Sequence, residues 1–183
     1  MNDKFTIANS RLNNEIRFIK QAFINFYGEK HRDYIINILD NLNVIWHDDS
    51  QKKEDKDIKN LIISSLPEDR IDEYLKKHDR ECFLQSAYID EIDVLVLPLS
   101  YNMTQIIHEL NHKISSHILS LEPLEMISGL CISREKNGGV VGQNIDLNEA
   151  INQKMTLEIL DELRKLGIEV HYTPAWQENM FPL

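Results

Sequence analysis

The chain has 183 residues, enough for one compact domain or for a helical subdomain packed on a catalytic one. Hydrophobic residues make up 42% and charged residues 27%, which is the balance of a folded protein rather than of a disordered or fibrous one. The net charge of −10 argues against a nucleic-acid partner, because such proteins concentrate Lys and Arg where they meet the phosphate backbone. The lysines between residues 52 and 59 are interleaved with acids, which predicts a solvated surface.

The cysteine count and the hydropathy pattern bear on location. Cys82 and Cys131 are too few to form a disulfide framework, which fits a reducing compartment. The sequence has neither an apolar N-terminal segment nor a run of about 18 apolar residues that could cross a bilayer. We therefore predict a cytoplasmic protein with no membrane partner.

Residues 1–80 predict a helical N-terminal subdomain. Apolar residues recur at helical spacing from Ile16 to Phe26 and again from Tyr34 to Leu42, and Asn9 and Ser10 are typical N-caps for the first helix. A helix over residues 69–77 is expected after Pro67. This part of the chain is expected to contain only helices.

From residue 81 the pattern changes to strands and longer helices. Cys82–Tyr88 and Ile92–Leu97 are rich in residues that favour strands, and Pro98 should close the second strand because proline cannot donate to a sheet ladder. The second strand could lie at an edge, where an extended peptide could pair with it, or in the interior. A long helix is expected over Met103–Leu121.

The last part predicts a hairpin and a second long helix. Asn137-Gly138 lies between the apolar runs 125–134 and 140–145, which is a strong signal for a hairpin turn. The second helix should begin near Asp146 to Asn148 and end at Leu166, with Gly167 as its stop. The predicted fold class is α+β, with the boundary between its two parts near residue 80.

The long helix over 103–121 carries the segment His108-Glu109-Leu110-Asn111-His112, an HExxH motif. Residues four apart on a helix differ in direction by only about 40°, so the two imidazoles project side by side and can bind one zinc ion. Glu109 lies about 100° further round, in the position of a general base for a water on that metal. Ile107, Leu110, Ile114 and Ile118 form a separate apolar stripe, expected to face the core.

Zinc requires a third protein ligand, and its position is predicted from the residues C-terminal to the motif. The metzincin pattern HExxHxxGxxH fails, because Ser115 and Ile118 replace its glycine and last histidine, and His117 points away from His108. Glu149, at the start of the next long helix, is the preferred ligand. Asp146 and Glu158 are the competing carboxylates, and Glu149 could instead serve only as a first-turn acid favoured by the helix dipole.

These residues resemble the gluzincin metallopeptidases, in which HExxH is followed by a helix that carries a glutamate ligand, often within an Asn-Glu segment. More narrowly, Ser128-Gly129-Leu130-Cys131, Gly142 and Leu147-Asn148-Glu149-Ala150 look like a group of bacterial metallopeptidases. The resemblance covers residues 92–166, and it implies that the second part, 81–183, is a zincin-like metallopeptidase core. Asn152 departs from the pattern, since a threonine commonly stands there. A repressor-cleaving type of metallopeptidase is the second-ranked resemblance, because its Glu-Ala-Asn pattern is only partly matched.

Family membership would imply a zinc-dependent metalloendopeptidase acting on a peptide or protein substrate. His108, His112 and Glu149 would bind Zn²⁺, and Glu109 would activate the zinc-bound water. His171 and Tyr172, beyond the second helix, are candidates for stabilising the oxyanion, although both could equally be core or surface residues. Many gluzincins continue past this point into a further helical subdomain. A catalytically inactive zinc-binding module that binds a protein partner is therefore the alternative function.

Overall fold

The computed structural model describes residues 3–48, 60, 62–64, 66–69, 71–72, 86–89, 93–118, 126–128, 131–136, 139–143 and 145–170. Between residues 116 and 148 only the backbone of these ranges is described. The expected helix over 69–77 falls mostly outside them, with helical backbone at residues 68–69 and 71–72. The lysine-rich stretch 52–59 and residues 171–183 also lie outside.

The N-terminal part begins with helix α1 (Asp3–Tyr27), the short 3-10 helix η1 (Glu29–His31) and helix α2 (Arg32–Asp40). The expected caps Asn9 and Ser10 are wrong, because both lie inside α1. The side chain of Asn9 instead accepts a hydrogen bond from Trp46 Nε1 at 2.8 Å, so its role is to hold the segment after α2 against α1.

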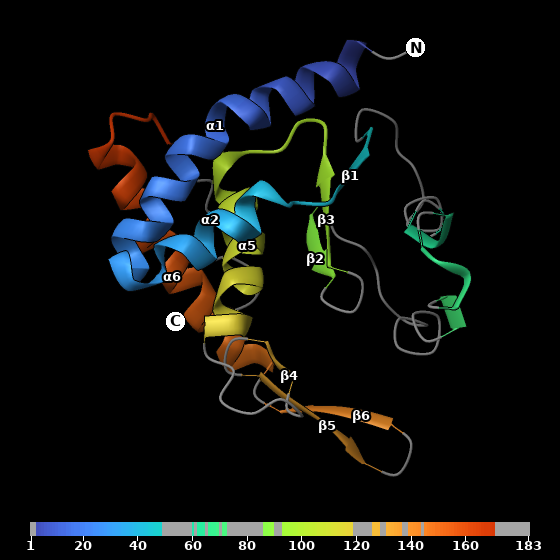
Figure 1. The fold of residues 1–183 in the computed structure, drawn as a ribbon. Coiled ribbons are helices and arrows are strands. Elements are labelled where there is room, and N and C mark those ends of the chain that lie inside the picture. The colour runs from blue at the N-terminus through green and yellow to red at the C-terminus, as the bar shows by residue number, and fades with distance from the viewer. Residues whose placement is uncertain are drawn as a thin grey trace.

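The expectation that residues 1–80 contain only helices is also wrong, because β1 (Val44–His47) follows α2. This strand pairs in parallel with β3 (Val94–Pro98), whose other edge pairs antiparallel with β2 (Ala87–Ile89). The sheet order is β1-β3-β2, so β3 is the interior strand and β2 lies at the edge (Figure 1). Pro98 is the last residue of β3, as the sequence predicted.

Helix α5 (Met103–Ile118) packs beside this sheet, and its start is fixed by Asn102. The Asn102 Oδ1 atom accepts a hydrogen bond from the Gln105 amide at 2.9 Å, while Gln105 Oε1 accepts from the Asn102 amide at 3.0 Å. This reciprocal arrangement satisfies two amides that the first helical turn leaves without partners. The apolar stripe of α5 faces the core, since Ile107, Leu110 and Ile114 are fully buried.

Strands β4 (Met126–Ser128), β5 (Cys131–Lys136) and β6 (Gly139–Gln143) form a second antiparallel sheet near the C-terminal end of α5 (Figure 1). Helix α6 (Ile145–Lys165) follows. Its last residue, Lys165, is followed closely by Gly167, whose φ of 82° is in the left-handed region that glycine tolerates. The Gly167 amide donates to the Arg164 carbonyl and the Ile168 amide to the Leu163 carbonyl, which is the Schellman motif of a helix C-terminus. The predicted helix end is confirmed, and the predicted hairpin is present as β5 and β6, although the expected run 125–134 is divided between β4 and β5.

The observed fold is α+β, as predicted. One continuous core joins α1, α2, α5, α6 and the first sheet, so it includes residues from both sides of position 80. Helix α1 contacts α6, and α6 contacts α5, which places the helices in one packed layer beside the sheet (Figure 1). Among the helices that the structure describes, none is long and apolar enough to cross a membrane. The largest side chains buried in this core are those of Tyr101, Phe23, Ile19, Ile35, Leu95, Leu97, Ile106, Ile107, Leu110 and Ile114.

Candidate metal centre

Helix α5 presents His108 and His112 on the same face, one turn apart. Their Nε2 atoms are 3.2 Å from one another and their rings lie nearly perpendicular, at 83°. Both side chains are largely shielded from solvent, with exposed fractions of 10% and 12%. The expected pair of neighbouring imidazoles is therefore present, and it lies at a boundary between helices rather than on a solvated helix surface.

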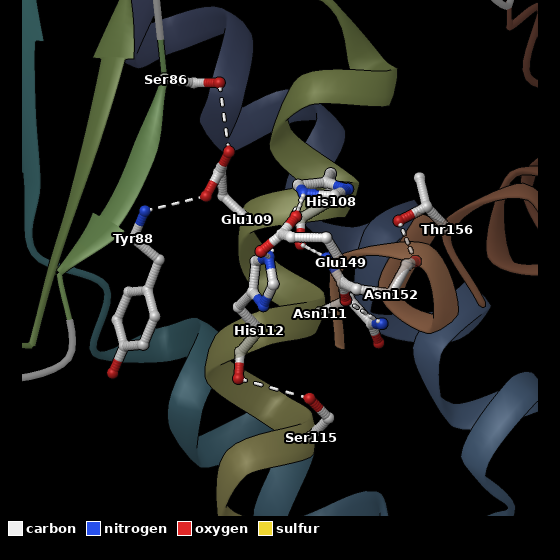
Figure 2. Close-up of polar contacts among 10 residues, drawn as sticks. All are labelled: Ser86, Tyr88, His108, Glu109, Asn111, His112, Ser115, Glu149, Asn152 and Thr156. Carbon is white, nitrogen blue, oxygen red and sulfur yellow. Dashed lines mark hydrogen bonds and ion pairs between the residues drawn. The ribbon is translucent and has the colours of Figure 1, made fainter. Parts of the chain in front are cut away.

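Helix α6 brings Glu149 to this pair. One carboxylate oxygen, Oε2, lies 3.2 Å from His108 Nε2, and the other, Oε1, lies 3.2 Å from His112 Nε2. The competing Glu158 is exposed further along α6, and the side chain of Asp146 is not described. Of the three carboxylates considered from the sequence, Glu149 is the one that the structure places against both histidines (Figure 2).

The separations among these three side chains fit a metal ion. Ligands bound tetrahedrally at about 2.0–2.1 Å from zinc lie about 3.3 Å from one another. The two Nε2 atoms are 3.2 Å apart and each lies 3.2 Å from a different oxygen of Glu149, so the three side chains converge closely enough to share one metal ion. The Glu149 side chain is 36% exposed, so this group of side chains is partly accessible to solvent.

Electrostatics favours the charged form of Glu149 and the protonated form of His108. Burial alone would raise the pKa of Glu149, but the hydrogen bonds and positive charge of His108 and His112 outweigh it and hold this pKa well below its usual range. Burial alone would lower the pKa of His108, but its hydrogen bond with Glu149 and the charges of Glu109 and Glu149 raise it. A divalent cation that replaced the His108 proton would experience the same attraction to these carboxylates.

Glu109 turns from this group toward the first sheet. Its Oε2 accepts a hydrogen bond from the Tyr88 backbone amide at 2.9 Å, and its Oε1 accepts one from the Ser86 hydroxyl at 3.3 Å (Figure 2). Only 7% of the residue is exposed. The HExxH helix therefore carries its acid on the face next to β2, with the two histidines facing α6.

Strand β2 is held beside Glu109 by a second set of contacts. Lys113, almost fully buried on α5, forms an ion pair with Asp93 and lies over the Tyr88 ring at 5.5 Å from its centroid. The Tyr88 hydroxyl donates to the same Asp93 carboxylate at 3.0 Å. Asp93 has a φ of 52°, a conformation that aspartate adopts more readily than most residues. These contacts fix the turn before β3 against α5.

Of the residues that excluded the metzincin pattern, the structure describes the side chain of Ser115. Ser115 is buried, and its hydroxyl donates to the His112 carbonyl at 3.4 Å within the same helix. The side chains of His117 and Ile118 are not described. The two oxyanion candidates, His171 and Tyr172, lie outside the described residues.

Three contributors to the site were not identified from the sequence. Ser86 and the Tyr88 amide bind Glu109, and Asn111 connects the two ligand helices by donating from Nδ2 to Asn152 Oδ1 at 2.5 Å. Asn111 lies inside the motif and is fully buried. Its spacing of four residues to Ser115 places two polar residues on one face of α5, and this pattern could have indicated a buried polar contact there. The backbone amide of Tyr88 leaves no signal in a sequence.

Comparisons with protein-family models, with characterised proteins and with solved structures found no significant match. The gluzincin resemblance therefore remains an expectation that rests on the motif and on the geometry of these side chains.

Proposed function

We propose that this chain is a zinc-dependent metallopeptidase with a zincin-like core, in which His108, His112 and Glu149 hold Zn²⁺ and Glu109 is the general base. The observation that carries the proposal is the convergence of the three side chains, with the two Nε2 atoms 3.2 Å apart and each of them 3.2 Å from one oxygen of Glu149. Two imidazoles and one carboxylate are the ligand set of many catalytic zinc sites, which keep the fourth position open.

Zinc at this position would polarise a peptide carbonyl and lower the pKa of a coordinated water to about 7. The chain's own contribution is to place a proton acceptor nearby and to keep it in one orientation. Glu109 has both carboxylate oxygens engaged by donors from β2 and the residue before it, so its side chain is held in one rotamer. A base held in this way accepts a proton without first losing conformational freedom.

The strand suited to an extended peptide is β2 rather than the expected segment 92–97, because β3 is interior. No described strand pairs with the outer edge of β2, which runs beside the HExxH helix (Figure 1). A peptide bound beside β2, whose Tyr88 amide already donates to Glu109, would run past this carboxylate and supply its carbonyl close to the histidines. We therefore propose an endopeptidase that binds its substrate in extended form.

A metal-binding module without catalytic activity is the second candidate. Its support is the position of Glu109, whose contacts with Ser86 and Tyr88 would also be explained if this residue only joined the helix to the sheet.

Metal content and cleavage, measured together, separate the two candidates. Purified protein should contain one zinc per chain and cleave an unstructured protein substrate. The Glu109→Gln variant should retain zinc, because residue 109 is not a proposed ligand and the amide oxygen can still accept from the Tyr88 amide. Its cleavage rate should fall by at least about 100-fold, the lower end of the range for general bases. Zinc without cleavage in the wild type would favour the binding module. Protein that takes up no zinc even after refolding in its presence would contradict both.

A further inference from the structure

Two buried asparagines connect the ligand helices next to the metal centre. Asn111 is fully buried on α5 and Asn152 is 3% exposed on α6. Asn111 Nδ2 donates to Asn152 Oδ1 at 2.5 Å, and Asn152 Nδ2 donates to the His108 carbonyl at 3.0 Å (Figure 2). On the other side, the Tyr27 hydroxyl of α1 bonds to Asn111 Oδ1 at 2.6 Å. We call Asn111 and Asn152 the amide bridge.

The donor and the acceptor of each hydrogen bond around the amide bridge follow from the His108 carbonyl oxygen. The His108 carbonyl can only accept, so the NH₂ group of Asn152 must face it and the Asn152 oxygen must face Asn111. The Asn111 NH₂ group is then the donor to Asn152, and its oxygen is left to accept from Tyr27. Burial raises the pKa of Tyr27, which keeps this hydroxyl protonated as the donor role requires. One arrangement of the two amides satisfies all of these contacts.

The bridge stands in the same relation to the ligands on both helices. Asn111 follows His108 by three residues, and Asn152 follows Glu149 by three residues. Residues three apart lie on neighbouring faces of a helix, so each asparagine is one turn from a donor of the metal centre. Asn152 also binds the backbone of His108 itself. The bridge therefore connects the two helices one turn away from Glu149 on α6 and one turn away from His108 on α5.

Apolar packing between α5 and α6 does not fix this separation as tightly. Hydrophobic contacts have no direction, and α6 could slide or rotate along α5 while it keeps most of its buried surface. Hydrogen bonds weaken steeply when their geometry changes, and a buried amide that loses its partner finds no water to replace it. A single buried polar pair fixes the register of helices in coiled coils by the same physics.

We propose that the amide bridge of Asn111 and Asn152 holds the register of the two ligand helices and thereby sets the metal affinity of the His108–His112–Glu149 group. This rests on the proposed function for its metal, and does not depend on peptide cleavage. Both asparagines are positioning residues, since neither contacts the metal position. Loss of groups that orient metal ligands typically lowers metal affinity by about 10- to 100-fold.

The test is the Zn²⁺ affinity of purified variants, measured by competition with a chromophoric chelator. Asn152→Ala should weaken binding by about 10- to 100-fold, and Asn111→Ala by less, because the bond from Asn152 to His108 survives. The double variant should bind zinc within about twofold of Asn152→Ala, since residues that act as one unit are not additive. The absorption spectrum of bound Co²⁺ should also change in Asn152→Ala, which reports altered ligand geometry.

Thr156→Val is the matched control. Thr156 is fully buried on the same helix, and its hydroxyl donates only along α6, to the Asn152 carbonyl at 2.8 Å. The substitution removes a buried hydrogen bond within α6 and leaves the hydrogen bonds between α5 and α6 in place. The zinc affinity of Thr156→Val should therefore stay within about twofold of the wild type. Circular dichroism and thermal unfolding of the metal-free proteins show which variants are folded. If Asn152→Ala does not fold, Asn152→Ser carries the same prediction, since serine is too short to reach Asn111.

The outcomes distinguish this proposal from the proposed function. Folded Asn152 and Asn111 variants that bind zinc as tightly as Thr156→Val would overturn the bridge and leave the metal centre intact. Wild-type protein that binds zinc but cleaves no peptide would refute the peptidase, and the bridge would still be decided by the affinities. Wild-type protein that binds no divalent metal would overturn both.

Discussion

Replacing Glu149 by Gln tests whether this carboxylate is the third metal ligand. In the structure its two oxygens lie 3.2 Å from His108 Nε2 and His112 Nε2, so both imidazoles lose a charged partner when the carboxylate becomes an amide. The side chain is partly exposed, so the substitution leaves no fully buried group without a partner, and the metal-free fold should be retained.

The size of the effect can be worked out by sharing the binding free energy among ligands. Structural zinc sites bind with about 10–16 kcal/mol, or about 2.5–4 kcal/mol for each of four ligands. Losing one ligand should therefore weaken zinc binding by about 10²- to 10³-fold. At free zinc 1,000 times the wild-type dissociation constant, zinc should stabilise the wild type by about 4.1 kcal/mol, but Glu149→Gln with 100-fold weaker binding by only about 1.4 kcal/mol.

Thermal unfolding with and without zinc measures this difference. For a chain of this size about 1 kcal/mol shifts the melting temperature by about 2–4 °C, so zinc should raise it by about 8–16 °C in the wild type and by about 3–6 °C in Glu149→Gln. Glu158→Gln is the control, because Glu158 is an exposed glutamate on the same helix and was a competing candidate. Equal zinc-induced shifts in the two variants would refute the assignment of Glu149.

Three further predictions concern the scaffold. Leu110→Ala, at a fully buried position on the HExxH helix, should lower the free energy of unfolding in urea by about 2–5 kcal/mol, whereas Ile7→Ala, at a residue 64% exposed, should change it by less than about 0.5 kcal/mol. Gly167→Ala should destabilise the protein by about 1–2 kcal/mol through its left-handed backbone alone, since a Cβ there would meet no atom within 4 Å; an unchanged melting temperature would contradict this. Burial raises the pKa of Tyr27, Tyr34 and Tyr101 above the value of about 10 that an unfolded chain shows, so the stability they contribute is present below about pH 10 and is lost as pH rises above it. Absorbance at alkaline pH should therefore show three of the six tyrosines ionising only as the protein unfolds. Titration of all six tyrosines at about pH 10 in the folded protein would contradict the burial of these three hydroxyls.

The parts of the site that lie on helices could be predicted from the sequence. Helical geometry alone places His108 beside His112, and the start of the next long helix pointed to Glu149. Gly167 marked the end of α6 because only a residue tolerant of positive φ completes that motif. These features are local, since the residues that determine them are close together in the chain.

The features that could not be predicted depend on partners far apart in the chain. Val44–His47 is a strand because β3 pairs with it, and a four-residue segment between a helix and a polar stretch carries no periodicity that reveals this. Asn9 is typical of a helix cap, yet its partner is Trp46, 37 residues away. The interior position of β3 likewise depends on strands on both sides of it, one of which was not expected.

The anchoring of Glu109 has a consequence for how this protein can tolerate sequence change. One of its two donors is a backbone amide, which every residue except proline would supply at position 88. The other is the Ser86 hydroxyl, which most substitutions would remove. Exchange of the Tyr88 side chain would thus keep the backbone hydrogen bond to Glu109, but it would remove the contacts of the ring with Lys113 and of the hydroxyl with Asp93. Most substitutions at position 86 would therefore remove a donor to Glu109, whereas at position 88 only proline would.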